Sequence, residues 1–255
     1  MRPLSKSLAV AAALVVAGYL AICALLYLLQ DRFIYYPVPR GVDTPAITLQ
    51  RGDADVVVST NGVESDHAIV YFGGNAEDVS RAIAPLARAF PGATIYAMHY
   101  RGYGGSTGTP SEFALVADGM ALLQRVRETH SRISLVGRSL GSGVAVQVAA
   151  SSPVERLVLV TPFNSIAELV AGPFKLFPTH LLLRDKYESW CHVQRLQVPT
   201  TIIVAANDQV VPTWSSRKLA DAFPAGVAKL VVIPDAGHNT VSDAAGYATA
   251  LGSSD

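Results

Sequence analysis

Gly137-Arg138-Ser139-Leu140-Gly141 is the stretch of this sequence that decides the fold. It follows a largely apolar run (132–136) and opens a stretch that is compatible with a helix (144–150). A sharp turn from strand to helix brings the two backbones together, so glycine on both sides of the serine avoids a clash with a Cβ atom. The pattern therefore predicts a nucleophile elbow, in which a strained turn exposes the hydroxyl of Ser139.

Two further candidate residues follow the serine, first an acid and then a histidine. Asp208 comes after a predicted buried strand (198–206), and His238 comes after the next predicted strand (228–233). A serine hydroxyl needs a positioned imidazole to take its proton, and the imidazole needs a carboxylate to fix its tautomer. Open α/β sheets build their sites beyond the carboxyl ends of strands. The sequence therefore predicts a catalytic triad of Ser139, Asp208 and His238.

Two other aspartates compete with Asp208 for the role of the acid. Asp185 lies in the segment 161–190, before the predicted strand 198–206, and Asp235 lies only three residues before His238 on the same loop. The position of Asp208 directly after a strand favours it. Taken singly, Ser139, Asp208 and His238 could be a turn serine, a loop cap and a surface histidine. Their order and their positions after strands together favour catalysis.

Composition limits the classes of function. The chain has 255 residues and a formal net charge of 0, and its basic residues form no runs, so we expect one large α/β domain and no nucleic-acid partner. The histidines are scattered and no Cys/His cluster has metal-ligand spacing, so we expect a site without a metal or cofactor. Cys23 and Cys191 are poor evidence for a disulfide framework. Cys23 lies in the N-terminal apolar segment, and we expect Cys191 to pack as a small hydrophobic side chain.

The N-terminal segment is long and apolar enough to cross a membrane. Leu8 to Leu29 carries no charge, and at ~1.5 Å per residue a helix of this length crosses a hydrocarbon core of ~30 Å. Arg2 and Lys6 precede the segment, which predicts a single-pass protein whose catalytic domain is extracytoplasmic, although Arg32 places a positive charge on the far side. A cleaved signal sequence is the alternative, but its apolar region would be only ~7–15 residues long.

The rest of the chain alternates predicted strands and helices. Residues 1–30 are predicted to be the membrane anchor, and residues 31–255 a single α/β domain. The expected strands are 47–49 and 56–59, which form an antiparallel entry hairpin, then 68–72, 94–99, 132–136, 156–160, 198–206 and 228–233. The expected helices are 76–90, 111–129, 144–150, 213–223 and 240–251. This alternation predicts a doubly wound, mostly parallel sheet.

Two segments of the predicted domain have alternative interpretations. Residues 161–190 are rich in Pro and Leu, and they form either a short apolar cap over the site or a helix pair packed on the sheet. The aromatic segment 33–39 either lies at the level of the lipid headgroups or packs the first strand onto the domain.

Two glycine-rich loops lie near the predicted site. Phe72-Gly73-Gly74-Asn75 leaves a predicted strand, where such a loop supplies one backbone N–H of an oxyanion hole, and the residue after the nucleophile supplies the other. By position we assign these donors to Asn75 and Leu140; an ordinary strand-to-helix turn is the alternative. The second loop, 99–108, lacks the Gly-Lys-Ser/Thr ending of a phosphate loop. We expect it to pack beside the site, with Arg101 bracing neighbouring loops.

From Phe33 to the C-terminus the chain resembles the α/β-hydrolase superfamily. Within it, the chain resembles the membrane-anchored branch that includes protein depalmitoylases and lysophospholipase-like enzymes. The motifs that carry the resemblance are Phe72-Gly73-Gly74-Asn75-Ala76, Tyr100-Arg101-Gly102-Tyr103-Gly104, Gly137-Arg138-Ser139-Leu140-Gly141-Ser142-Gly143, Thr161-Pro162-Phe163-Asn164-Ser165, Leu183-Arg184-Asp185-Lys186-Tyr187, Asn207-Asp208-Gln209-Val210-Val211-Pro212 and Gly237-His238-Asn239. The resemblance implies the α/β-hydrolase fold, with Ser139 as nucleophile, Asp208 as acid and His238 as base.

These features predict a serine hydrolase that cleaves carboxylic ester or thioester bonds through an acyl-enzyme on Ser139. A short apolar cap suits a small-molecule or lipid-like acyl ester as the substrate. A triad does not distinguish an ester from an amide, so a serine peptidase of the same fold is an alternative. A membrane-anchored binding module that keeps the fold without catalysis is the alternative from another class.

Overall fold

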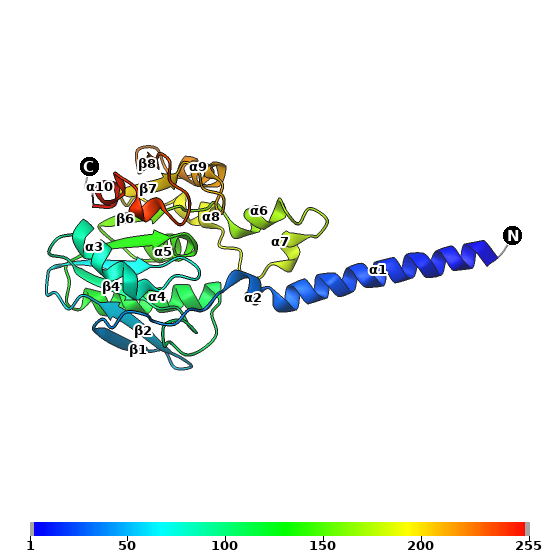
Figure 1. Cartoon of the computed structure of the whole chain (residues 1–255), viewed down its shortest axis with the longest axis horizontal. Helices are drawn as coiled ribbons and strands as arrows, with labels where there is room; N and C mark the ends of the chain where they lie inside the picture. The colour runs from blue at the N-terminus through cyan, green and yellow to red at the C-terminus, as the bar shows by residue number, and fades with distance from the viewer. Residues whose placement is uncertain (1–2, 253–255) are drawn as a thin grey trace.

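The computed structural model describes residues 3–252 of the chain, and its body is built on one eight-stranded sheet (Figure 1). The strands are β1 (Ala46–Gln50), β2 (Asp55–Thr60), β3 (His67–Phe72), β4 (Thr94–Met98), β5 (Arg132–Arg138), β6 (Arg156–Val160), β7 (Thr200–Ala205) and β8 (Ala228–Ile233). Their spatial order is β1-β2-β4-β3-β5-β6-β7-β8. β1 pairs with β2, and β2 with β4, in antiparallel fashion, whereas the neighbours from β4 to β8 are parallel. The predicted hairpin and the predicted mostly parallel sheet are confirmed.

Helices cover both faces of the sheet, as predicted for a doubly wound fold. One face carries α4 (Glu112–Arg127), α5 (Leu140–Ser151), α8 (Ser189–Val193) and α9 (Thr213–Asp221). The other carries the short 3₁₀ helices η1 (Val79–Ala82) and η2 (Val241–Asp243), with α3 (Ile83–Ala89) and α10 (Tyr247–Gly252). Successive side chains of a strand point to opposite faces, so Val70 packs with α4 and α5 while Ile69 packs with α3 and α10. A strand buried on both faces reads as a continuous apolar run, which is why β3 is recognisable in the sequence.

Two predicted helices are shorter than the sequence pattern indicates. Ala76 has a φ of 55°, and the chain turns before η1 begins, so the prediction of a helix over 76–90 is wrong at its start. The predicted helix 240–251 is divided into η2 and α10, with Gly246 between them at a φ of 85°. In both places the apolar periodicity continues through a turn, so periodicity alone could not locate the break.

The prediction that Cys191 packs as a small hydrophobic side chain is wrong. The short helix α8 buries Ser189 and Val193, which lie four residues apart on one side of the helix, and Cys191 between them is exposed. Cys23, in contrast, is buried.

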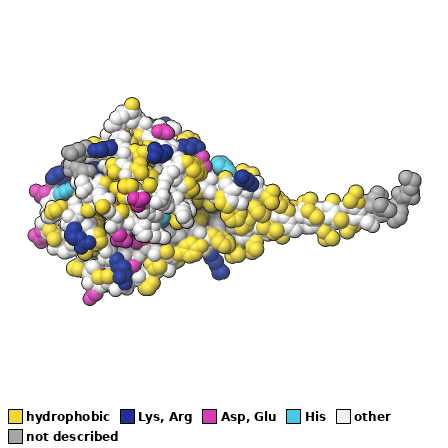
Figure 2. All heavy atoms as spheres, turned by 45° about the horizontal axis from the view of Figure 1, so that its top comes forward, with side chains coloured by type: hydrophobic (Ala, Val, Ile, Leu, Met, Phe, Trp, Pro, Cys, Tyr) yellow, Lys and Arg dark blue, Asp and Glu magenta, His cyan; other side chains and the backbone are white. Residues whose placement is uncertain are grey.

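The N-terminal helix α1 (Pro3–Leu29) extends away from the body of the molecule (Figure 1). Its segment Lys6–Leu29 is long and apolar enough to cross a membrane, and it is almost wholly exposed. Apolar side chains cover its surface in Figure 2. By length and composition α1 is therefore a candidate membrane anchor. Arg2, on which the predicted topology partly depends, and residues 253–255 of the predicted domain lie outside the described residues.

The cap segment (residues 161–190) begins and ends in the buried body of the molecule, and its middle part lies beside the end of α1. Its helices α6 (Ile166–Ala171) and α7 (Thr179–Leu182) lie near the junction of α1 with α2 (Asp31–Ile34) in Figure 1. The interpretation of this segment as a cover over the site stays a prediction. In the aromatic segment that follows α2, Tyr35 is buried in the body, while Phe33 and Tyr36 are exposed.

Candidate active site

The backbone at Ser139 has the strained geometry that the glycine pattern predicts. Ser139 lies between β5 and α5 with a φ of 48° and a ψ of −118°, in a region that side chains rarely adopt. A Cβ on Gly137 would lie 2.5 Å from the carbonyl oxygen of Gly141, and one on Gly141 would lie 2.0 Å from that of Phe72. Both glycines are thus required by close backbone contacts, and the turn they permit lifts Ser139 out of the sheet.

The structure brings Ser139, His238 and Asp208 together from the ends of three strands. His238 Nε2 lies 2.9 Å from Ser139 Oγ, and His238 Nδ1 lies 2.8 Å from Asp208 Oδ2. Asp208 Oδ1 accepts hydrogen bonds from the backbone amides of Val210 and Val211 at 2.9 and 2.7 Å. One carboxylate oxygen is thus held by the loop while the other faces the imidazole. A histidine held in this way can take the proton of a serine hydroxyl, and the catalytic roles of the three residues stay a prediction.

The two rival aspartates have other surroundings. Asp185 accepts a hydrogen bond of 2.7 Å from the hydroxyl of Tyr35, which is also 3.0 Å from the hydroxyl of Tyr187. Burial raises the pKa of Tyr35, so this hydroxyl stays protonated as a donor. Asp235 is exposed, at a φ of 55° in the turn before His238. Only Asp208 of the three forms a hydrogen bond to His238 among the described residues.

The loop that carries Asn75 lies against the elbow. A Cβ built on Gly74 would be 3.5 Å from the Cβ of Ser139. Leu140 is the first residue of α5, where a backbone N–H has no partner within the helix. In the part of the chain that the structure describes, neither the amide of Asn75 nor that of Leu140 donates to another protein group. Both are available to a bound substrate, and their assignment to an oxyanion hole stays a prediction.

The side chain of Asn75 is held by groups that the sequence did not connect with it. Its Oδ1 accepts hydrogen bonds from the backbone amide of Tyr36 at 2.9 Å and from the hydroxyl of Tyr103 at 2.8 Å. Its Nδ2 donates to the carbonyl oxygen of Ile34 at 2.7 Å. Burial raises the pKa of Tyr103 to about 12, so its hydroxyl remains a donor at neutral pH. The glycine-rich loop 99–108 therefore does reach the site, through Tyr103, whereas Arg101 pairs with Asp53 and Asp118.

A second group of contacts missed by the sequence analysis centres on Arg138. Its guanidinium lies 3.2 Å from Glu77 Oε2 and donates to the carbonyl oxygen of His238 at 3.2 Å. Burial lowers the pKa of Arg138, but the charge and hydrogen bond of Glu77, together with Tyr71 and Tyr247, outweigh burial, so the pKa is raised. Glu77 also accepts hydrogen bonds of 2.6 Å from the hydroxyl of Tyr71 and the amide of Gly74. The presence of an arginine beside the serine was the only sequence signal of this link.

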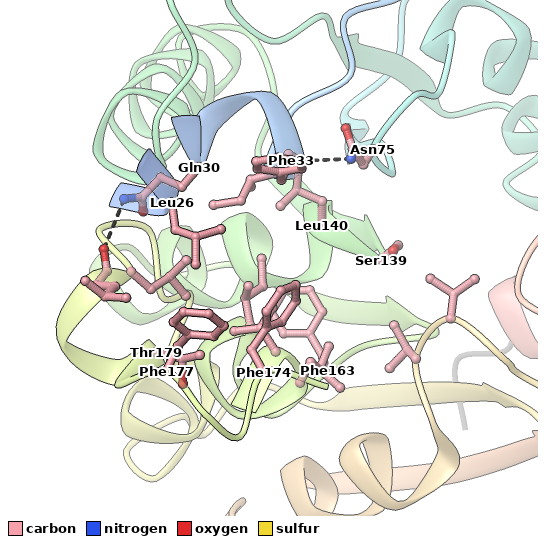
Figure 3. Close-up of a pocket in the computed structure, with 18 residues that line it drawn as sticks. Leu26, Gln30, Phe33, Asn75, Ser139, Leu140, Phe163, Phe174, Phe177 and Thr179 are labelled. Carbon is pink, nitrogen blue, oxygen red and sulfur yellow. Dashed lines mark hydrogen bonds between the residues drawn. The ribbon is translucent and has the colours of Figure 1, made fainter. Parts of the chain in front are cut away.

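Ser139 borders two cavities of different character. One, of about 370 Å³, is mainly apolar and is shown in Figure 3, with Ser139 and Leu140 near one end. The other, of about 620 Å³, is less apolar, because its lining also includes charged and polar side chains such as Asp78, Arg81 and Asn239. Both volumes are within or close to the range of ~300–1,000 Å³ for small-molecule sites. Among residues 3–252 no three His, Cys, Asp or Glu side chains are grouped as metal ligands.

Similarity to known proteins identifies the family. A family model described as serine hydrolase matches residues 117–249, which include Ser139, Asp208 and His238. An uncharacterized protein of Mycobacterium tuberculosis is 34% identical over 227 residues, covering 82% of this chain and 80% of the relative. The chain belongs to the serine hydrolase family. A further relative of this serine hydrolase is the lysophosphatidylserine lipase ABHD12 of Danio rerio, 29% identical over 217 residues that cover 74% of this chain and 54% of the lipase.

A solved structure supports the fold of this serine hydrolase. The alpha/beta hydrolase domain-containing protein 10 from mouse superposes with a TM-score of 0.65 at 15% identity, covering 82% of this chain and 96% of that one. The predicted α/β-hydrolase fold is thus confirmed.

Proposed function

We propose that this serine hydrolase cleaves carboxylic ester or thioester bonds through an acyl-enzyme on Ser139. The observation that carries the proposal is the hydroxyl of Ser139, which lies 2.9 Å from His238 Nε2 and borders an apolar cavity of about 370 Å³. The relationship to a lysophosphatidylserine lipase supports an ester substrate.

The mechanism begins when His238 Nε2 takes the proton of Ser139 as Oγ attacks the substrate carbonyl carbon. The amides of Asn75 and Leu140 donate hydrogen bonds to the oxyanion, and Asp208 keeps His238 Nδ1 protonated and stabilises the imidazolium. The intermediate collapses, the bond to the leaving group breaks, and the leaving group takes the proton from His238. Water, deprotonated by His238, then attacks the acyl-enzyme, and the carboxylic acid leaves as Ser139 regains its proton.

In this proposal the two cavities hold the two parts of an amphiphilic substrate, one on each side of the scissile bond. Phe163, Leu169 and Phe174 line the apolar cavity, which suits the acyl group. The larger cavity, with Asp78 and Arg81 in its lining, suits a polar leaving group. We therefore propose an acyl ester or thioester with an apolar acyl part as the substrate.

The proposed organisation is an anchor (residues 1–30) followed by a hydrolase domain (residues 31–255) with a cap at about 161–190. The apolar length of α1 supports the anchor. Arg2 and Lys6 before the apolar run support a cytoplasmic N-terminus and an extracytoplasmic hydrolase domain.

A fluorophosphonate probe, which reacts with activated serines, tests the proposed chemistry on the full-length protein in detergent. We expect wild-type protein to be labelled and Ser139→Ala to be unlabelled. Ser151→Ala is the matched control, because Ser151 is an exposed serine on α5, and this variant should label at the wild-type rate. Absence of labelling of the wild type would favour a binding module without catalysis.

A substrate panel separates an esterase from a peptidase. We expect turnover of p-nitrophenyl butyrate and of the matching thioester, and little turnover of aminoacyl p-nitroanilides. Faster turnover of the anilides than of the esters would identify a serine peptidase instead.

A further inference from the structure

We infer that α1 is part of the substrate site as well as an anchor: its last turn contributes Leu26 to a wall of the apolar cavity, and acyl chains enter the cavity from the bilayer. The inference rests on the proposed function and narrows its substrate to an acyl chain that resides in a membrane.

The packing of α1 on the cap segment is specific and begins at Tyr19, ten residues before the end of the helix. The hydroxyl of Tyr19 donates a hydrogen bond of 2.9 Å to the carbonyl oxygen of Leu176. The rings of Tyr19 and Phe177 are stacked, with centroids 5.7 Å apart and planes 1° from parallel. Two turns later, the guanidinium carbon of Arg184 lies 5.4 Å from the centre of the Tyr27 ring. The cap segment therefore contacts α1 at both ends of a stretch of nine residues, from 19 to 27.

The end of α1 is fixed to the cap segment by Gln30. Its Nε2 donates to the carbonyl oxygen of Leu182 at 3.0 Å, and its Oε1 accepts from the backbone amide of Arg184 at 2.7 Å. Arg184 also pairs with Asp31 at 2.6 Å. Gln30 is only 6% exposed, and its donor and acceptor are both engaged, so this polar residue can line an apolar cavity without an unpaired group.

The side chains that close the cavity on the α1 side come from the anchor and the helix after it. Leu26 belongs to the last turn of α1, Gln30 is the residue between α1 and α2, and Phe33 belongs to α2. Figure 3 shows these three residues across the cavity from Phe174 and Phe177 of the cap segment, with Ser139 at the other end. Without α1, this wall of the cavity would lose the side chain of Leu26.

Through the contacts of Tyr19, Leu176 and Phe177 of the cap segment lie beside the part of α1 that we propose to be in the membrane. Tyr19 precedes Leu29 by ten residues, which is ~15 Å of helix, or about half of a ~30 Å hydrocarbon core. Apolar side chains around the junction are exposed: Leu176 is 84% exposed, Leu181 80% and Phe33 63%. In Figure 2 the apolar surface continues from α1 onto the adjoining part of the body. Contiguous exposed apolar surface of this kind marks a membrane contact.

Entry of an acyl chain from the bilayer is favourable because the bilayer interior and the cavity are both apolar. An acyl chain that passes from the bilayer into a cavity walled by α1 exchanges one apolar surrounding for another and need not expose its methylenes to water. The ester carbonyl, at the polar end of the chain, would then be carried towards Ser139.

The test uses full-length protein in phosphatidylcholine vesicles, with p-nitrophenyl palmitate and p-nitrophenyl acetate as substrates. Leu26→Trp fills the cavity from the α1 side, so the ratio of palmitate to acetate turnover should fall by about tenfold. Leu28→Trp is the matched control: the same substitution two residues on, at a leucine that is 69% exposed, should leave the ratio at the wild-type value. An unchanged ratio in Leu26→Trp, or an equal fall in Leu28→Trp, would overturn the inference.

A photoreactive probe provides a second measurement on unmodified protein. A palmitoyl-like fluorophosphonate with a diazirine at the chain end should label Ser139 and, on irradiation, cross-link to peptides from 22–33 and 174–183. Labelling of Ser139 with cross-links only to other parts of the chain would exclude the α1 wall while leaving the hydrolase intact. Failure of this probe and of short fluorophosphonates to label Ser139 would instead remove the proposed function, and the inference with it.

Discussion

The guanidinium of Arg138 donates a hydrogen bond to the backbone carbonyl oxygen of His238, 3.2 Å away and 100 positions later in the sequence. The same side chain pairs with Glu77, whose carboxylate accepts from the amide of Gly74. One arginine thus connects the proposed nucleophile, the proposed base and the loop of the proposed oxyanion hole. We regard Arg138 as a positioning residue, since it acts through these neighbours.

Arg138→Lys tests this connection. Lysine keeps the charge but cannot bridge Glu77 and His238 with a planar fork, so kcat/KM on p-nitrophenyl butyrate should fall by about tenfold to a hundredfold, as expected for loss of ~1.5–3 kcal/mol. The fall should be in kcat with KM little changed. Arg132→Lys, at an exposed pair with Glu155, is the control and should keep wild-type kinetics. Wild-type kcat in Arg138→Lys would show that the link has no role in positioning.

Asp208→Asn tests the assignment of the acid. Loss of tautomer control at His238 should lower kcat by about 10³–10⁴-fold. Asp235→Asn should be close to wild type because Asp235 is exposed, and Asp185→Asn should lower the melting temperature more than kcat because Asp185 bonds buried Tyr35. A larger loss of kcat in either of these variants than in Asp208→Asn would reassign the acid.

Tyr103→Phe tests the support of the Asn75 loop. The substitution removes the hydroxyl that donates to Asn75 Oδ1 and accepts from the amide of Tyr36. An oxyanion donor acts mainly in the transition state, so we expect kcat to fall about tenfold with KM little changed. Tyr96→Phe, at the hydroxyl that pairs with His130, is the matched control. A rise in KM without a fall in kcat would indicate a role in binding rather than in positioning Asn75.

His99 should make stability depend on pH. Burial lowers the pKa of His99 from 6.5 to about 4, and Ser59 Oγ lies 2.9 Å from its Nε2. Because the folded pKa is below the unfolded one, the unfolded chain binds a proton first as the pH falls. His99 should therefore lower the free energy of unfolding by at most about 3 kcal/mol between about pH 6.5 and 4, with no further loss below.

Urea denaturation in detergent, at neutral pH and at about pH 5, measures this dependence. In His99→Gln the difference between the two pH values should be smaller than in the wild type, whatever the absolute stability of the variant. An equal difference in both proteins would assign the pH dependence to other groups.

The proposed topology predicts that the hydrolase domain is accessible from outside. Protease added to intact cells, or to spheroplasts if the source is bacterial, should digest the domain, and alkaline carbonate should leave the protein in the membrane. Complete protection of the domain would show the inverse orientation, and extraction by carbonate would show that α1 does not span.

Local sequence rules were sufficient for the elbow and for most of the sheet. Gly137 and Gly141 are needed because backbone atoms lie where a Cβ would be, and this constraint is visible in five consecutive residues. The strands β3 and β7 are buried on both faces, so both contain continuous apolar runs, 68–72 and 202–205. The breaks at Ala76 and Gly246 were not predictable in the same way, because the apolar period of the flanking residues passes through them.

The sequence by itself therefore determined the fold class, the elbow, the order Ser139, Asp208, His238 and the length of the apolar helix, because each depends on a short-range pattern or on chain order. Only the tertiary structure decided that Tyr103 holds Asn75, that Arg138 reaches His238, and that Leu26 walls a cavity beside Ser139. These contacts join residues 28 to 113 positions apart in the sequence. Their proximity is set by how the sheet, the cap segment and α1 pack together, and a pattern within one segment carries no information about its distant neighbours.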